Sequence, residues 1–111
     1  MKLYLAGPMR GYAEFNFPAF REAASKLREA GYKVWSPAEH DEAEGFNPLT
    51  DVAQPLKYYM KHDLPAVLDA DAIAVLPGWE KSRGATLEVH VATACEMPIY
   101  TVARLLSPYI K

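Results

Sequence analysis

The apolar run from Ala72 to Leu76 constrains the fold of this 111-residue chain more than any other feature. Every residue in the run is apolar, which is typical of a strand buried on both faces at the centre of a parallel sheet. Further strand-like runs at residues 3–6, 33–35 and 98–102 alternate with segments whose apolar residues recur at helical spacing. This alternation predicts an α/β fold: a doubly wound parallel sheet of about four or five strands, flanked by helices.

Local signals place most of the helices. Asn16 is a candidate N-cap for the first helix, and Gly31 is a candidate C-cap. Residues 38–53 are polar and acidic and predict a long loop, with or without one helical turn, of a kind that is usually functional or mobile. Helical spacing returns at Leu56, and Pro65 is expected to kink or restart that helix. The last long helix is expected to carry an apolar stripe of Leu87, Val91, Ala94 and Cys95.

Composition excludes several classes of function. The formal net charge is −2 and the basic residues are spread along the chain, so we expect no duplex nucleic acid as a partner. The single cysteine, Cys95, has no intrachain partner, which favours a reducing compartment and predicts a cytoplasmic protein. No apolar run approaches the roughly 20 residues that a membrane span needs, and no signal-peptide pattern is present. His40, His62 and His90 lack metal-ligand spacing, so no metal site is expected.

Glu88 stands on an apolar face of its predicted helix. Its neighbours at helical spacing are Ala85, Val91 and Ala92, and no basic residue lies three or four positions away. Desolvation on such a face raises the pKa of a carboxyl group and suits it to nucleophilic or acid–base chemistry. The same position also suits a glutamate that stabilises a helix N-terminus through the macrodipole. Spacing alone favours neither interpretation.

Asp63 is a second carboxylate on an apolar stripe, four residues after Tyr59 and seven after Leu56. Burying an unpaired carboxylate there costs several kcal/mol, so Asp63 is expected either to face a polar pocket or to cap backbone near Pro65. Tyr4 lies within the first strand-like run. Its ring is expected either to be part of the core or to present its hydroxyl at the end of the strand.

Two glycine-bearing loops follow strands, at the edge where open α/β sheets bind ligands. Their backbone amides and guanidinium groups suit a phosphate, although neither loop is a Walker A sequence or a dinucleotide-binding fingerprint. Ordinary turn glycines beside solvated arginines are the alternative interpretation. Trp79 either stacks on a flat ligand or covers the core. The candidate binding residues in these loops are Gly7, Pro8, Arg10, Gly11, Gly78, Trp79, Ser82, Arg83 and Gly84.

With these residues in place, the chain resembles the nucleoside 2-deoxyribosyltransferase-like superfamily. It is most similar to the small, often phage-borne branch described as DUF4406. Residues 4–11, 16–20, 62–64 and 70–88 carry the resemblance. The Pro-Gly-Trp-Glu and Ser-Arg-Gly-Ala sequences within the last segment are specific to that branch. The resemblance implies one domain over residues 1–111, with a flavodoxin-like or Rossmann-like fold.

The resemblance also implies an activity that needs no cofactor. Characterised relatives cleave the N-glycosidic bond of 2′-deoxynucleosides or their 5′-monophosphates, or exchange the base. By resemblance Glu88 is the nucleophile that forms a glycosyl ester, which water or an incoming base resolves. Asp63 matches the aspartate that contacts the base or leaving group, and Tyr4 matches the tyrosine that orients the glutamate.

Subfamily differences concern the phosphate and the subunit interface. Monophosphate N-hydrolases resemble this chain at Gly7, Arg10, Gly11, Ser82 and Gly84, which favours a nucleotide over a nucleoside, although they carry a serine where this chain has Pro8. Relatives complete the site with C-terminal residues of a neighbouring subunit. We therefore expect a homodimer or larger homo-oligomer, with residues 106–111 as the segment in question.

Two other classes of function stay open. In the first, the chain is a non-catalytic nucleotide-binding sensor or sequestering module, in which Glu88 binds a ribose hydroxyl and residues 38–53 act as a lid. Ligand-dependent stabilisation with the ligand recovered intact would favour it. In the second, the chain is a flavodoxin-like redox protein that shares only the fold class, and a colourless purified protein would argue against it.

Overall fold

The computed structural model describes residues 1–107 and contains one parallel sheet. Its strands lie in the order β2-β1-β3-β4, and β1 and β3 form the centre, with Leu3 opposite Ala72 and Ala6 opposite Val75. The predicted parallel α/β fold is confirmed, with four strands. The strand bounds are Lys2–Ala6 for β1, Lys33–Trp35 for β2, Ala72–Val75 for β3 and Ile99–Thr101 for β4.

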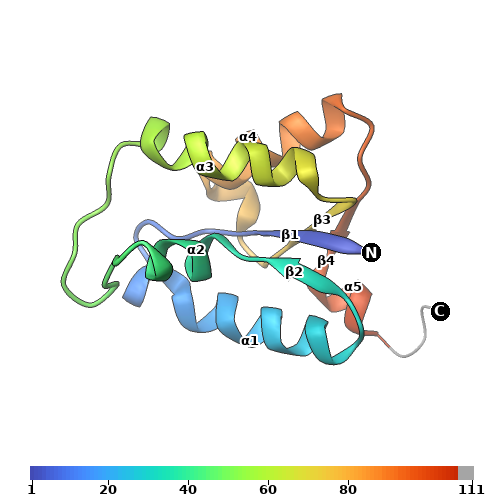
Figure 1. Cartoon of the computed structure of the whole chain (residues 1–111), viewed down its shortest axis with the longest axis horizontal. Helices are drawn as coiled ribbons and strands as arrows, with labels where there is room; N and C mark the ends of the chain where they lie inside the picture. Colours follow the sequence, from blue (N-terminus) through green and yellow to red (C-terminus); the bar gives the residue numbers. More distant parts are fainter. Residues whose placement is uncertain (108–111) are drawn as a thin grey trace.

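Helices cover both faces of the sheet (Figure 1). Side chains of β1 alternate between the faces, as in any strand. Leu3 and Leu5 join one core cluster with α1 (Phe17–Glu29) and α5 (Val102–Leu106). Tyr4 and Ala6 join the other, beneath α3 (Leu56–Asp69) and α4 (Arg83–Ala94). The only charged side chains buried among residues 1–107, Asp63 and Glu88, come from this second pair of helices.

The start of α1 differs from the prediction. Asn16 occupies the N-cap position, but its backbone is left-handed at φ +61° and its side chain makes no capping bond. Instead its Nδ2 donates to the carbonyl oxygen of Pro8 at 2.9 Å. Asn16 therefore anchors the loop that follows β1. Ala30 is the C-cap of α1, and Gly31, the predicted C-cap, directly follows it with φ +99°.

The region predicted as a long loop contains a helix of seven residues, α2 (Pro37–Ala43). Between α2 and α3 (Leu56–Asp69), residues 44–55 form turns and irregular structure. Proline at the first position of a helix costs nothing there, because that amide has no partner within the helix. Pro65 does not interrupt α3, which continues to Asp69. Pro65 and Lys61 are both exposed, and because proline has no N–H, the Lys61 carbonyl lacks its usual helical partner.

The predicted apolar stripe of α4 is wrong. The buried side chains are Ala85, Glu88 and Ala92, whereas Leu87 and Cys95 are exposed. Counting apolar residues misplaces the stripe, because a buried carboxylate stands at its centre. Within residues 1–107, no helix is long and apolar enough to cross a lipid bilayer.

Gly7 marks a close approach between the ends of β1 and β3. A Cβ atom at this position would lie 2.8 Å from the Cβ of Leu76. We expect Gly7→Ala to lower the free energy of unfolding by about 1–3 kcal/mol, because such overpacking forces neighbouring atoms apart. Thermal unfolding would then shift down by roughly 4–8 °C per kcal/mol in a domain of this size.

Ser25→Ala, on the exposed face of α1, is the matched control and should leave the midpoint nearly unchanged. A Gly7→Ala variant as stable as the wild type would mean that Leu76 moves aside at no cost.

Candidate active site

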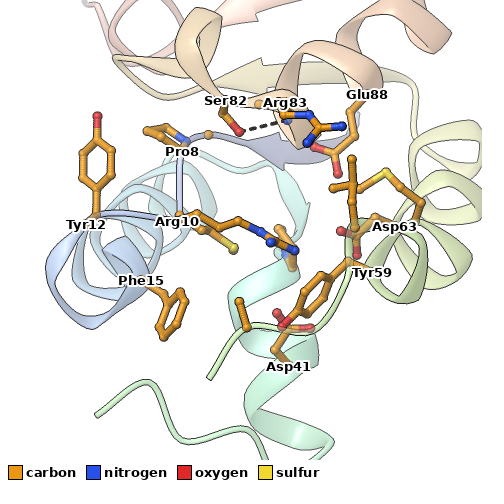
Figure 2. Close-up of a pocket in the computed structure, with 18 of the residues that line it drawn as sticks. Pro8, Arg10, Tyr12, Phe15, Asp41, Tyr59, Asp63, Ser82, Arg83 and Glu88 are labelled. Carbon is orange, nitrogen blue, oxygen red and sulfur yellow. Dashed lines mark hydrogen bonds between the residues drawn. The ribbon is translucent and has the colours of Figure 1, made fainter. Parts of the chain in front are cut away.

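A pocket of about 600 Å³ opens at the carboxyl ends of β1 and β3 (Figure 2). In the strand order, β2 lies on one side of β1 and β3 lies on the other. The carboxyl ends of β1 and β3 are therefore the switch point at which such sheets bind ligands. The walls come from the loop after β1, from α2, from residues 46–55, and from α3 and the start of α4. The volume lies in the range of small-molecule sites.

Glu88 lies one turn into α4 and is only 4% exposed. The hydroxyl of Tyr4, which is completely buried in β1, donates to Oε2 of Glu88 at 2.7 Å. Burial, and then the negative charge of Glu88, raise the pKa of Tyr4 well above its usual range, so the phenol stays a hydrogen-bond donor. Trp35 stacks on the Tyr4 ring at 5.3 Å and fixes its orientation.

Asp63 faces the same pocket from α3 and is 6% exposed. Its Oδ1 has no hydrogen-bond partner. Burial, and then the charge of Asp41, raise the pKa of Asp63 to about 7. Burial, and then the charge of Asp63, raise the pKa of Glu88 well above its usual range, against the hydrogen bond from Tyr4. A state in which two buried, neighbouring carboxyl groups are both charged is unfavourable, so near neutral pH the pair retains one proton.

The N-terminus of α4 forms another part of the wall. Ser82 is its N-cap, and Oγ accepts a hydrogen bond from the amide of Ala85 at 3.1 Å. Lys81, Arg83 and Gly84 line the pocket beside it. Free amides and cationic side chains at a helix N-terminus favour an anion.

The loop after β1 contributes Gly7, Pro8 and Arg10 to the pocket lining. The Arg10 side chain extends across the pocket (Figure 2), donates to the carbonyl oxygen of Gln54 and lies 5.8 Å from the centre of the Tyr59 ring. The structure therefore brings the two predicted loops to one pocket. It does not bring the Arg10 guanidinium to Ser82.

Three predicted binding residues do not line the pocket. Gly11 is exposed, and Gly78 lies behind the pocket wall, where a Cβ would meet the hydroxyl of Tyr12 at 2.8 Å. Trp79 packs against the core cluster that contains Tyr4, so it covers the core instead of facing a ligand. Tyr4 also lies behind the lining and reaches the pocket through Glu88.

Asp41 is the pocket carboxylate that the sequence analysis missed. It lies on α2, and burial raises its pKa to about 6, against the opposing effect of His62. The sequence Ser36-Pro37 was the available signal, because serine followed by proline is typical of an N-cap and first helical position. Asp41 then lies one turn after Pro37, on the same helix face. Other lining residues that were not singled out include Tyr12, Phe15, Phe46, Tyr59 and Met60.

Two further expectations concern metals and the C-terminus. Among residues 1–107, no group of three His, Cys, Asp or Glu side chains is arranged to hold a metal ion. The expected contribution of residues 106–111 to a neighbouring subunit falls mainly on residues 108–111, which lie outside the described residues.

The family described as "Domain of unknown function (DUF4406)" matches residues 1–101. The chain belongs to the DUF4406 family. This DUF4406 protein also superposes, with a TM-score of 0.65 and 22% sequence identity, on the 2-deoxyribosyltransferase of the psychrotolerant bacterium Bacillus psychrosaccharolyticus. The match covers 91% of this chain and 71% of that chain, and at this identity it establishes a shared fold. No curated protein matches this chain in sequence. The family match over residues 1–101 confirms the predicted resemblance to DUF4406.

Proposed function

We propose that this DUF4406 protein cleaves the N-glycosidic bond of 2′-deoxynucleoside 5′-monophosphates, passing the sugar to water or to a second base. The observation that carries the proposal is the buried pair Glu88 and Asp63 at the pocket wall, with Tyr4 hydrogen-bonded to Glu88. Buried carboxyl groups with raised pKa values that share a cleft are typical of acid–base and nucleophilic sites. The fold shared with a 2-deoxyribosyltransferase supports the same class of reaction.

The spacing along α4 supports a phosphorylated substrate. Glu88 follows Arg83 by five residues, which corresponds to about 7.5 Å along a helix axis. A phosphate at the helix N-terminus would therefore leave room for a furanose ring whose anomeric carbon faces Glu88. Lys81 and Arg83 supply positive charge at this end of the pocket, and Arg10 would reach it by leaving the Gln54 carbonyl.

The pair would divide the chemistry by protonation state. The mechanism requires the charge of the pair on Glu88, whose Oε2 accepts the hydrogen bond from Tyr4, and the proton on Asp63. The Glu88 carboxylate attacks the anomeric carbon, the carbon–nitrogen bond breaks, and the base leaves with the proton of Asp63. The Asp63 carboxylate then takes a proton from water, which displaces Glu88 and releases the 2-deoxyribose 5-phosphate. Two displacements give net retention, as in retaining glycosidases.

The direct test incubates the protein with the common 2′-deoxynucleosides and their 5′-monophosphates, and measures free base by chromatography. We expect release from monophosphates, and base exchange when a second free base is added. Substrates that stabilise the protein against heat but are recovered intact would instead support the non-catalytic binding module. If the protein releases no base and is not stabilised by any of these compounds, both proposed functions are refuted.

Arg10→Ala tests the phosphate seat. We expect kcat/KM for monophosphates to fall by up to about 10-fold, because the phosphate gains only the difference between a charge-assisted hydrogen bond and the bond that Arg10 already makes to the Gln54 carbonyl. Activity on the matching nucleosides should change little. Steady-state kinetics on each nucleoside and its monophosphate measures the difference, and Arg104→Ala, on the exposed surface of α5, is the matched control. Equal losses on both substrates would contradict a phosphate role for Arg10.

A further inference from the structure

Asp41 lies at the far end of the pocket from the anion-binding end. Figure 2 shows its carboxylate across the pocket from Ser82, beyond Tyr59. Within residues 1–107, no side-chain hydrogen bond or ion pair engages this carboxylate, although His62 lies within electrostatic range. An acceptor group held at the end of a pocket with no partner in the protein is suited to a ligand donor.

The surroundings of Asp41 suit a flat heterocycle. Phe46 lies close by and packs edge-on against Phe15 at 5.2 Å, and both rings line the pocket with Tyr59. Aromatic walls with one or two fixed polar groups are typical of pockets that bind aromatic ligands and orient them. Asp63 is the second polar group, more than nine-tenths buried, with its Oδ1 unpartnered.

The order of groups along the pocket decides which part of a substrate meets Asp41. This step rests on the proposed function. With the phosphate at Ser82 and the anomeric carbon at Glu88, the base extends past Asp63 toward α2. Its outer edge then meets the carboxylate of Asp41.

We propose that Asp41 is a specificity residue that accepts a hydrogen bond from an exocyclic amine of the base. The preferred substrates are then nucleotides of cytosine, adenine or guanine, and those of uracil, thymine or hypoxanthine are used less well where a carbonyl oxygen replaces that amine. An ionised carboxylate has only acceptors, so it pairs with amine N–H groups and leaves a facing carbonyl oxygen without a partner. Two facing acceptors without a donor between them cost more than the loss of one good contact.

Matched substrate pairs test this assignment. The 5′-monophosphates of deoxycytidine and deoxyuridine differ at one exocyclic group, as do those of deoxyadenosine and deoxyinosine. At pH 7, where a group with a pKa of about 6 is mostly ionised, we expect kcat/KM to favour the amine in at least one pair by about 10–100-fold. Asp41→Asn gives the side chain a donor, so the ratio in that pair should fall at least about 10-fold, with the carbonyl substrate gaining.

Glu42→Gln is the control. It removes the same charge from the same helix, at an exposed position that pairs with Arg21 at 2.8 Å. We expect it to leave the ratio unchanged. Equal use of both members in each pair by the wild type would overturn the proposal, and so would an Asp41→Asn variant that folds normally and keeps the wild-type ratio.

The outcome stays distinguishable from failure of the proposed function. If no base is released from any nucleotide, the glycosidase assignment fails. Dissociation constants for the same pairs, measured by titration calorimetry, then test Asp41 by itself. Tighter binding of the amine member that is lost in Asp41→Asn would support the specificity role in a binding protein. Equal affinities would reject it.

Discussion

Replacing Glu88 with glutamine is expected to reduce the rate of base release by at least about 10³-fold. Glutamine keeps the size of the side chain and can still accept the hydrogen bond from Tyr4, but its amide is a poor nucleophile and cannot form the glycosyl ester. Binding of the nucleotide should persist, because the phosphate end of the pocket is unchanged. Single-turnover kinetics measures the rate, and thermal stabilisation by the nucleotide measures binding.

Glu80→Gln is the matched control, because Glu80 is exposed on the short 3-10 helix Trp79–Lys81 that precedes α4 and does not line the pocket. A covalent intermediate is also expected to be detectable. A 2-fluoro sugar analogue slows breakdown of a glycosyl ester, and mass spectrometry of the digested protein should find the sugar on the peptide that contains Glu88. Full activity in Glu88→Gln, or a sugar attached elsewhere, would rule out Glu88 as the nucleophile.

Asp63→Asn is expected to have opposite effects on activity and stability. Base release should fall by about 10²–10⁴-fold, because asparagine cannot protonate the leaving base. The free energy of unfolding at pH 8 should rise by about 2–4 kcal/mol, because a buried group whose pKa rises from 3.8 to about 7 costs roughly 1.4 kcal/mol per pH unit to ionise. Urea unfolding at pH 5 and pH 8 measures the second effect.

The sign of the pH dependence follows from the raised pKa. Folded Asp63 holds its proton to a higher pH than unfolded Asp63, so its contribution to stability is complete below about pH 4 and is lost as pH rises through about 7. Burial raises the pKa of Glu88 and Asp41 as well, so Asp63→Asn should also lose some stability between pH 5 and pH 8. The wild type should lose more, because it also contains Asp63. Equal losses in the two proteins would mean that Asp63 does not titrate as a buried acid.

The wild-type rate should likewise decline above about pH 7, as the proton of the pair is lost. Asp63→Asn should lack this decline. Its residual rate would then follow the ionisation of Glu88 alone.

The sequence was sufficient to predict the sheet and two of the three pocket carboxylates. A fully apolar run predicts a central parallel strand, and Glu88 and Asp63 are conspicuous because each interrupts an apolar stripe. Helical spacing singled out both carboxylates as candidates, but it left the role of Glu88 open, and only the packing of the folded chain shows which face of α4 is buried. The pairing of Glu88 with Tyr4 joins residues 84 positions apart and was available only through the family resemblance.

The third carboxylate, Asp41, was not predictable in the same way. The sequence of α2 has almost no apolar periodicity, and its helix is held by contacts from elsewhere. Arg28 of α1 binds Glu39 at 2.5 Å and Arg21 binds Glu42 at 2.8 Å, while Ala38 is buried in the core. Trp79 shows the same limit, since only the packing of the folded chain decides whether an aromatic ring after a strand faces a ligand or the core.

The contact between Arg10 and the Gln54 carbonyl has a consequence for turnover. In the empty pocket the guanidinium already has an acceptor, so an incoming phosphate replaces one hydrogen bond with another and gains only the difference. Substrate and sugar-phosphate product would carry the same phosphate, and the reduced gain weakens the hold on both alike. Under the proposed function, an arginine that can return to a backbone carbonyl would therefore help the product to leave.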